Sequence, residues 1–164
     1  CAAGTFAPNL EMGKCLPCPA GTYQDESQAK SCKQCYAAHY CEEGASVPRP
    51  CPGGTHSNSS LKVMTSVEQC LACPTGTFCS LGSIEPSPCV PGTFNPFTNA
   101  WMCLKCPSGK FQDEAGSSSC KPCRIGHYCE EGASAPLPCR EGTYSKATNL
   151  TNAASSPHFP QASQ

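Results

Sequence analysis

Aromatic and cysteine residues set the hydrophobic pattern of this chain, because its other apolar residues occur in runs of only a few positions. An aromatic residue stands five positions after a cysteine in eight places, which uses eight of the twelve aromatic residues. The eight are Phe6, Tyr23, Tyr40, Phe78, Phe94, Phe111, Tyr128 and Tyr144, and His56 takes the ninth such place. Each ring is predicted to cover the disulfide of its own segment and to shield it from water.

Glycine stands two positions before most of these rings and predicts a turn. The glycines are Gly4, Gly21, Gly54, Gly76, Gly92, Gly109, Gly126 and Gly142, and Ala38 takes the ninth place. Glycine adopts positive φ at little cost, so we expect a turn with positive φ at this position. The chain also holds 14 Gly and 17 Pro, which leaves little room for long helices.

These turns belong to a short repeat, Cys-x-x-Gly-Thr-Tyr/Phe, that begins nine times. The repeats begin at Cys1, Cys18, Cys35, Cys51, Cys73, Cys89, Cys106, Cys123 and Cys139, and we number them 1 to 9. Six cysteines from Cys15 to Cys51 also recur 88 positions later, from Cys103 to Cys139. The chain is therefore a tandem repeat.

Each complete repeat holds one further cysteine, which lies six, fourteen or nineteen residues after the first. Two cysteines per repeat predict one disulfide per repeat, although crossed or interlocked pairings stay open on spacing alone. The predicted pairs are Cys1 with Cys15, Cys18 with Cys32, Cys35 with Cys41, Cys51 with Cys70, Cys73 with Cys79, Cys89 with Cys103, Cys106 with Cys120, and Cys123 with Cys129. Cys139 is left over. We expect its partner beyond Gln164 in an interior fragment of a longer protein, with an intermolecular bond as the alternative.

Composition indicates that covalent bonds replace a conventional core. Leu, Ile, Val and Phe together make up about 12% of the chain. Chains in which this share falls below roughly 20% tend to stay disordered. Cysteine makes up about 10%, the level of disulfide scaffolds. We therefore expect complete reduction to abolish the fold.

Three short repeats end in Pro-x-Pro, which predicts extended, polyproline-like connectors that are stiffer than Gly/Ser linkers. The predicted divisions are repeats 1 and 2 (residues 1–34), repeats 3 to 5 with a long loop at 51–70 (residues 35–88), repeats 6 to 8 (residues 89–138), and an incomplete ninth repeat with a Ser/Thr/Pro-rich loop (residues 139–164). Stiff connectors between small repeats predict a rod or strap.

Charge and sequence motifs place the chain outside the cell. The net charge is −1 and no basic stripe occurs, so neither nucleic acid nor direct membrane insertion is expected. Asn58 and Asn149 begin Asn-x-Ser/Thr sequons and are predicted N-glycosylation sites. Dense cysteine together with these sequons predicts an oxidising, extracellular location, secreted or at the cell surface.

Three chemical alternatives compete with the disulfide interpretation. The spacing of Cys15, Cys18, Cys32 and Cys35, and of their counterparts 88 residues on, approaches that of a four-thiolate zinc site. Five Cys-x-x-Cys pairs could belong to a dithiol oxidoreductase, but no βαβ pattern surrounds them. His39 and His127 stand beside Glu-Glu pairs, as a metal or pH-sensitive site would require, although repetition accounts for them equally well. We predict no metal, no cofactor and no enzymatic activity.

The units joined by Cys-x-x-Cys, such as the stretch from Cys15 to Tyr23, resemble the ephrin-receptor-like cysteine-rich repeat. That family belongs with the cysteine-rich modules of growth-factor and tumour necrosis factor receptors, and the resemblance covers residues 1 to about 145. It implies an EGF-like, disulfide-laddered extracellular segment with short hairpins. We predict a small disulfide-rich fold, an elongated tandem array of short cysteine-rich loops and hairpins with little helix and no large core.

Repeats of this kind look like those of receptor ectodomains and of large surface or filamentous proteins, including ciliary appendages. The leading hypothesis is a structural spacer or packing element of an extracellular assembly, whose partners are other copies or other extracellular proteins of that assembly and N-linked glycans. The alternative is a ligand-binding cysteine-rich ectodomain of a cell-surface receptor. The short repeats and Pro-x-Pro connectors depart from the plainest receptor pattern, so no ligand-binding residue is transferred.

Overall fold

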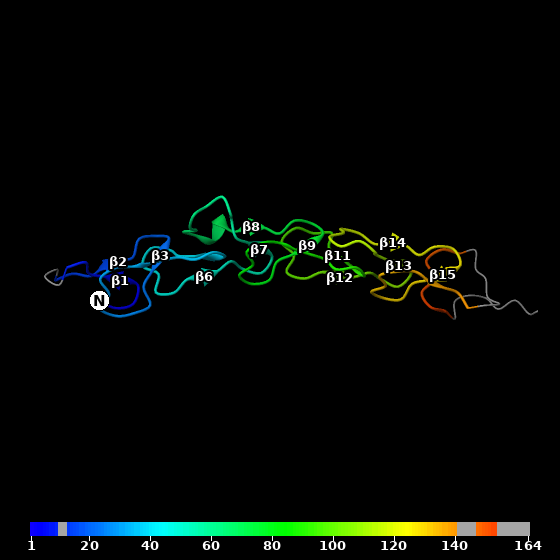
Figure 1. The fold of residues 1–164 in the computed structure, drawn as a ribbon, viewed down its shortest axis with the longest axis horizontal. Coiled ribbons are helices and arrows are strands. Elements are labelled where there is room, and N and C mark those ends of the chain that lie inside the picture. The colour runs from blue at the N-terminus through cyan, green and yellow to red at the C-terminus, as the bar shows by residue number, and fades with distance from the viewer. Residues whose placement is uncertain (10–12, 141–146, 154–164) are drawn as a thin grey trace, which may run out of the picture. The chain divides into compact units, whose positions relative to one another are not determined.

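The computed structural model describes residues 1–9, 13–140 and 147–153. Within these ranges the chain forms eight antiparallel hairpins, each of two two-residue strands (Figure 1). The first strands are β1 (Thr5–Phe6), β3 (Thr22–Tyr23), β5 (His39–Tyr40), β7 (Thr55–His56), β9 (Thr77–Phe78), β11 (Thr93–Phe94), β13 (Lys110–Phe111) and β15 (His127–Tyr128). Their partners are β2 (Leu16–Pro17), β4 (Lys33–Gln34), β6 (Arg49–Pro50), β8 (Leu71–Ala72), β10 (Ser87–Pro88), β12 (Leu104–Lys105), β14 (Lys121–Pro122) and β16 (Leu137–Pro138).

The repeat sequence accounts for this hairpin. The turn before the first strand is closed by the fifth residue of the repeat, whose N–H donates to the carbonyl of the second, as in Thr22 to Pro19 at 3.0 Å. Threonine adds its hydroxyl to the same carbonyl, at 2.6 Å in Thr22. The predicted positive φ is confirmed at every described fourth position, Ala38 included. Gly142 and Tyr144, predicted for the ninth repeat, lie outside the described residues.

The second strand corrects the prediction for the Pro-x-Pro segments. They are extended, but their last two residues pair in the hairpin as β6, β10 and β16 instead of spacing one repeat from the next. Proline is tolerated because each of these strands pairs on one side only, so a position without an N–H can face away from the ladder. The ladder is continued by the N–H of the following cysteine, as in Cys51, which donates to the carbonyl of Ala38 at 2.9 Å.

Regular helix is almost absent from the described part of the chain. Its one helical segment is the 3₁₀ helix η1 (Val67–Gln69), in the long loop of repeat 4. The side chain of Gln69, the last residue of this helix, accepts the Thr65 N–H on its Oε1 at 2.7 Å. The fold class is thus confirmed as a disulfide-rich tandem array of short hairpins.

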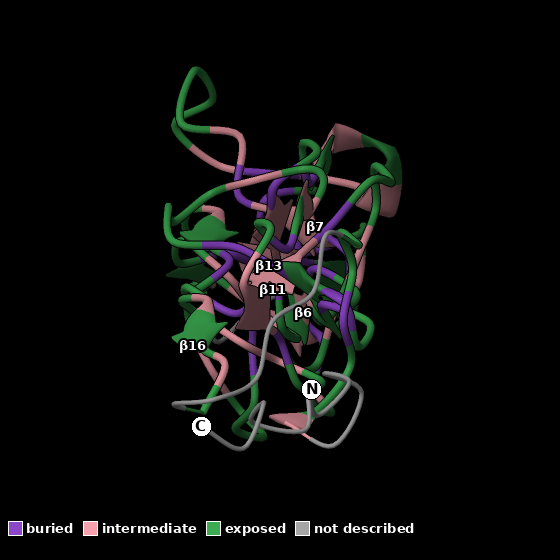
Figure 2. Ribbon diagram, turned by 90° about the vertical axis from the view of Figure 1, so that its right-hand side faces the viewer, coloured by how far each residue is buried: buried purple, intermediate pink, exposed green. Residues whose placement is uncertain are grey.

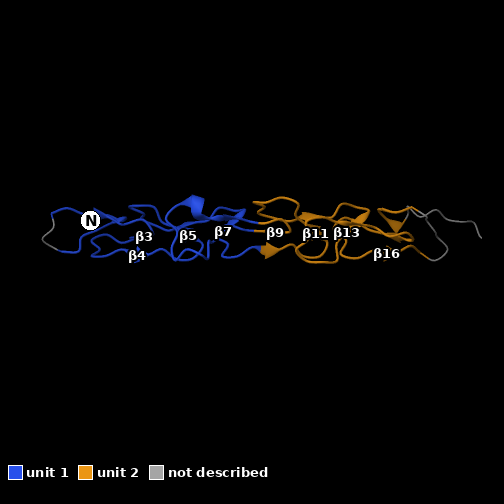
Figure 3. Ribbon diagram, turned by 90° about the horizontal axis from the view of Figure 1, so that it is seen from above, with its two compact units in different colours: residues 1–73, 79–86 blue, residues 74–78, 87–164 orange. Residues whose placement is uncertain are grey.

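The chain divides into two compact units, shown in separate colours in Figure 3. Compact unit 1 consists of Cys1–Cys73 and Cys79–Pro86, and compact unit 2 consists of Pro74–Phe78 and Ser87–Gln164. In each unit the buried residues lie on short stretches of backbone between exposed loops (Figure 2). Ten of the fourteen buried apolar residues in the described ranges are cysteines, so the disulfides themselves form the core.

Two backbone hydrogen bonds join consecutive repeats inside each compact unit. In the first, the N–H of the fourth residue donates to the carbonyl of the seventh residue of the next repeat. Gly21 to Cys41 and Gly92 to Gln112 are examples, both at 2.7 Å. In the second, a residue with positive φ in the next repeat donates to the carbonyl of the first cysteine, as Gly44 does to Cys18 at 2.8 Å. Both bonds occur at most junctions, whereas between repeats 3 and 4 the Ala38 N–H donates to the Ser57 hydroxyl at 3.2 Å.

Candidate functional site

The structure forms eight disulfides among the described cysteines, and their partners are those that the spacing predicts. The Cα atoms of the bonded pairs lie 5.3 to 6.1 Å apart, within the normal range. The pairs are Cys1–Cys15, Cys18–Cys32, Cys35–Cys41, Cys51–Cys70, Cys73–Cys79, Cys89–Cys103, Cys106–Cys120 and Cys123–Cys129. Cys139 is half-buried, and its N–H donates to the Gly126 carbonyl at 3.0 Å.

These bonds decide the zinc and redox alternatives. In the sequence Cys15, Cys18, Cys32 and Cys35 form a possible tetrad, but their sulfur atoms belong to three different disulfides, so no set of four thiolates exists there. Each Cys-x-x-Cys pair consists of the last cysteine of one disulfide and the first cysteine of the next. The described residues also contain no group of three or more His, Cys, Asp or Glu side chains arranged as metal ligands.

One aromatic ring covers a different disulfide from the one predicted. Phe111 of repeat 7 is buried in a cluster with Cys123 and Cys129, which form the disulfide of repeat 8. The prediction that each ring shields the disulfide of its own repeat is therefore wrong at Phe111. The reason is the bond from Gly109 to Cys129, at 2.8 Å, which brings the next repeat against this hairpin.

The seventh position of each repeat is a structural site that the sequence analysis missed. In the short repeats it holds the second cysteine, and in four of the five long repeats it holds a buried polar side chain, at Gln24, Ser57, Asn95 and Gln112. The long repeat 1 has the half-buried Ala7 there. Gln112 binds both ends of its own loop, because its Nε2 donates to the Ser119 carbonyl at 2.6 Å and its Oε1 accepts the Glu114 N–H at 3.0 Å. Gln24 makes the same two bonds in repeat 2. The alternation of cysteine with Gln, Asn or Ser at this position was a signal in the sequence.

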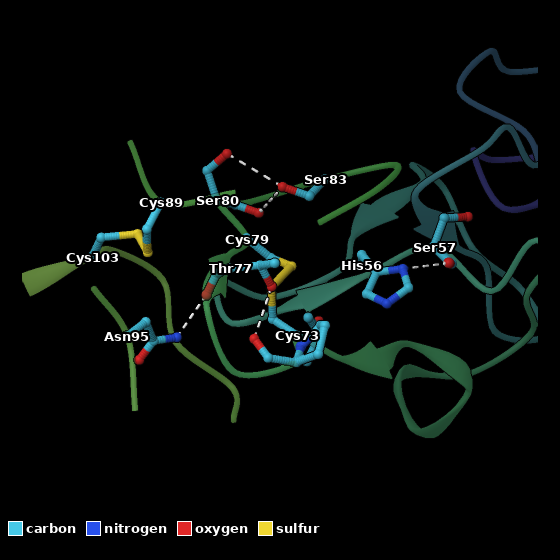
Figure 4. The surroundings of a disulfide bond; sticks show 12 residues. His56, Ser57, Cys73, Thr77, Cys79, Ser80, Ser83, Cys89, Asn95 and Cys103 are labelled. Carbon is cyan, nitrogen blue, oxygen red and sulfur yellow. Dashed lines mark hydrogen bonds between the residues drawn. A yellow bond between two sulfur atoms is a disulfide. The ribbon is translucent and has the colours of Figure 1, made fainter. Parts of the chain in front are cut away.

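Figure 4 shows two of the local arrangements in the middle of the chain. The loop closed by Cys73–Cys79 continues into a turn in which the hydroxyl of Ser83 donates to the Ser80 carbonyl at 2.9 Å. Asn95 donates from Nδ2 to the Thr77 carbonyl at 2.6 Å (Figure 4). The same Nδ2 also donates to the Phe97 carbonyl at 2.9 Å. A buried amide therefore connects its hairpin with the preceding one and with its own loop.

Exposed ion pairs recur 88 residues apart. Lys33 contacts Asp25 at 2.6 Å and Glu26 at 3.1 Å, and Lys121 contacts Asp113 at 2.7 Å in the same way. The hydrogen bond from Lys33 lowers the pKa of the Asp25 carboxyl, and the bond from Asp25 raises the pKa of Lys33. Because these groups are solvent-exposed, the pairs contribute little to stability and shape only the loop surface.

The histidines at the fifth position take the place of threonine. The Nδ1 atom of His39 lies 3.0 Å from the Ala37 carbonyl, and that of His127 lies 3.1 Å from the Ile125 carbonyl. The neighbouring glutamates face basic residues instead of the imidazoles, since Glu42 lies 3.6 Å from Arg49 and Glu131 lies 3.9 Å from Lys105. The two places are equivalent by repetition.

Compact unit 1 contains a groove of about 400 Å³, lined by residues 36–37, 39, 56–59, 61–64 and 84–86. Its wall is formed by the long loop of repeat 4, which returns to repeat 3 through a parallel bridge between Tyr40 and Met64. The N–H of Cys41 donates to the Met64 carbonyl at 3.1 Å, and Met64 is buried. The loop between Cys51 and Cys70, whose sequence separation is 19, thus supplies a wall that the shorter repeats do not have.

The two sequons occupy different environments. Asn58 lines the groove, and its Oδ1 accepts the N–H of Ser60 at 3.1 Å. Asn149 has a φ of 64° and donates its N–H to the Cys123 carbonyl, so its backbone fills the second bonding position between repeats. Asn149 is exposed. Asparagine suits this position without a glycan, because it adopts positive φ more readily than most residues.

Compact unit 2 carries an exposed apolar loop in repeat 6. Phe97 and Trp101 are 65% and 66% exposed, and Met102 next to Trp101 is also exposed. The base of the loop is closed by Cys89–Cys103 and by Asn95, whose Oδ1 accepts the Phe97 N–H at 3.0 Å. Aromatic residues and methionine on a fixed base are typical of protein-binding surfaces.

No helix within the described ranges combines the length and apolar composition needed to cross a bilayer. The model of one protein family, described as tyrosine-protein kinase ephrin type A/B receptor-like, matches residues 4–49 and 92–135, which together exceed half of the chain. A search of curated proteins finds no match.

Proposed function

Because this chain belongs to the ephrin-receptor-like cysteine-rich family, a non-catalytic type of extracellular module, we propose that it is a structural spacer and packing element of an extracellular assembly. Its role in this proposal is mechanical. The disulfides keep each loop from extending, and the bonds between repeats keep neighbouring hairpins at one spacing. Its partners are other copies or other extracellular proteins of the assembly.

The observation that carries this proposal is that the same backbone bond joins repeats of different length. Gly92 to Gln112 joins two long repeats, whereas Gly109 to Cys129 joins a long repeat to a short one, and the two bonds measure 2.7 and 2.8 Å. Differences in loop length are absorbed by the exposed loops, not by the junction. Such a junction suits a segment whose task is to set a distance.

Small-angle X-ray scattering of the oxidised chain tests the spacer role. A compact domain of this length has a radius of gyration of about 15 Å. We expect a markedly larger value that is independent of protein concentration in the dilute range. A radius close to that of a compact domain would rule out a spacer.

The exposed loop with Phe97 and Trp101 favours a second candidate, the ligand-binding ectodomain of a receptor. Trp101 is the only tryptophan of the chain, so its fluorescence reports directly on whether this loop becomes buried. If copies pack through the loop, we expect the Trp101 fluorescence emission to move to shorter wavelength as the protein concentration rises. In Phe97→Ala, which removes the neighbouring ring, this shift should be absent. A chain that stays monomeric, in a parent gene that encodes a membrane span and a cytoplasmic signalling domain, would favour the receptor.

A further inference from the structure

We propose that the groove of compact unit 1 holds the first sugars of an N-linked glycan on Asn58, with Tyr36 as the ring on which they stack. The inference rests on the proposed extracellular role, because the secretory pathway is where such glycans are added. It assigns the groove to a ligand that the chain itself carries.

The position of Asn58 is the first step. Asn58 lines the groove, and its Oδ1 is held by the N–H of Ser60. The main chain turns back at this point, since the Leu61 N–H donates to the Asn58 carbonyl at 3.1 Å. With Oδ1 facing its own turn, the amide nitrogen that bears a glycan lies on the other side of the side-chain amide. A glycan on Asn58 therefore starts at a residue of the groove lining and needs no flexible linker to reach the groove.

The second step is an aromatic ring in the same groove lining. Tyr36 is 53% exposed, yet its ring is fixed from two sides. The His39 ring packs on it with centroids 4.4 Å apart, and Tyr23 meets it edge-on at 6.3 Å. The face of an aromatic ring carries partial negative charge and attracts partly positive C–H edges, which sugar rings offer on one side.

The third step is the polar lining. Both His39 and His56 direct Nδ1 to a backbone carbonyl, Ala37 at 3.0 Å and Ser57 at 2.9 Å. In the neutral ring the Nδ1 atom then carries the proton, and Nε2 is an acceptor. Sugar hydroxyls supply donors for two such acceptors, whereas apolar side chains supply none.

Size and charge agree with a carbohydrate. The groove volume of about 400 Å³ lies within the range of small-molecule sites. Lys62 and Glu85 line it with one charge of each sign, so the lining has no net charge that would select an ionic ligand. Apolar surface from Leu61 and Ile84 completes the mixed character that sugar rings need.

The test uses the 164-residue chain secreted from cells that add N-glycans, with occupancy of Asn58 measured by mass spectrometry. NMR on the glycosylated chain should show nuclear Overhauser contacts between sugar protons and the Tyr36 ring, in cis and independent of concentration. Removal of the glycan by an amidase should shift the ring signals of Tyr36 and His39. The inference would be overturned if Asn58 were unmodified or if no such contacts were seen. It would also be overturned if the contacts disappeared on dilution, because they would then come from the glycan of a second molecule.

Variants supply the second readout, the rate at which an endoglycosidase releases the Asn58 glycan. We expect about fivefold faster release in Tyr36→Ala, the factor that a contact of about 1 kcal/mol gives. Tyr36→Phe keeps the stacking face and should release slowly, and Trp101→Ala removes an equally exposed ring elsewhere as the matched control. Equal release rates in all four proteins would contradict the inference. If free-thiol analysis shows Tyr36→Ala misfolded, the NMR contacts of the unmutated chain decide. A compact scattering radius would refute the spacer role without touching this result.

Discussion

The fourth residue of each repeat shows how one residue serves two purposes. Gly92 has a φ of 86°, a conformation that side chains rarely adopt. It also lies against the backbone of repeat 8, so close that a Cβ there would meet the carbonyl oxygen of Gly132. The positive φ follows from the turn, whereas the close approach follows from packing between repeats that are two apart in sequence.

Three alanine substitutions separate these two effects. Gly126 has a φ of 74° and open space around its Cβ direction, so Gly126→Ala should cost about 1 to 2 kcal/mol for the backbone alone. Gly92→Ala should cost clearly more, because the Gly132 carbonyl must move away. Gly13, with open space and no positive φ, is the control and should change little. Urea unfolding followed by amide signals measures all three, and equal losses for Gly92→Ala and Gly126→Ala would contradict the packing role.

The buried amide at the seventh position predicts a second residue effect. Gln112 is 3% exposed, and its side chain binds both ends of its loop. Gln112→Met keeps the length of the side chain but leaves two backbone groups without these partners, which should cost about 1 to 2 kcal/mol. The exposed Gln34 in β4 offers the matched control, and Gln34→Met should be close to neutral because this side chain faces solvent. A neutral Gln112→Met in the same unfolding assay would show that water replaces both bonds.

At the scale of the element, the hairpin is constant and only its closure varies. In long repeats the disulfide joins the first cysteine to a second cysteine that is half-exposed, as Cys89 is joined to Cys103. Short repeats close within six residues, and both of their sulfur atoms are buried, as in Cys73–Cys79. The residue at the seventh position distinguishes the two forms. Cysteine there forms the disulfide of a short repeat, as Cys79 does, whereas a Gln or Asn amide there forms hydrogen bonds to the loop of a long repeat.

This difference predicts the order in which the disulfides are reduced. Exchange requires that a reductant reach a sulfur atom, so the bond with an exposed member, Cys1–Cys15, should open first. Cys73–Cys79 should be among the last. Limited reduction followed by alkylation and peptide mass mapping gives the order. In strong denaturant the two bonds should react at similar rates, and a persistent difference there would mean that burial is not the cause.

At the scale of the whole molecule, stability is covalent before it is hydrophobic. Apart from cysteine, the buried apolar residues within the described ranges are Ala38, Met64, Phe111 and Leu150. Four side chains cannot offset the conformational entropy of ordering the chain, which is on the order of 1 to 2 kcal/mol per residue. Each closed loop removes roughly 2 to 3 kcal/mol of entropy from the unfolded state instead.

Complete reduction should therefore unfold every repeat at once. We expect the amide signals of the reduced chain to collapse to the narrow range of an unfolded protein, and to disperse again after reoxidation. Circular dichroism is a poor readout here, because strands of two residues give a weak signal. A reduced chain that kept dispersed amide signals would show that hydrogen bonds between repeats suffice without the disulfides.

The sequence by itself determined the features that depend on short separations along the chain. The eight cysteine pairs lie six to nineteen residues apart, and the turn at the fourth position lies within one repeat, so the repeat pattern predicts both. Crossed pairings, which spacing left open, are absent from the eight disulfides among the described cysteines. The tertiary structure decided what depends on the approach of one repeat to another. It placed Phe111 on the disulfide of repeat 8 and assigned Asn149 to a junction. It also folded the long loop of repeat 4 back onto repeat 3, which forms the groove. Contacts between repeats have no local signature, because backbone carbonyls make most of them, and every residue has one.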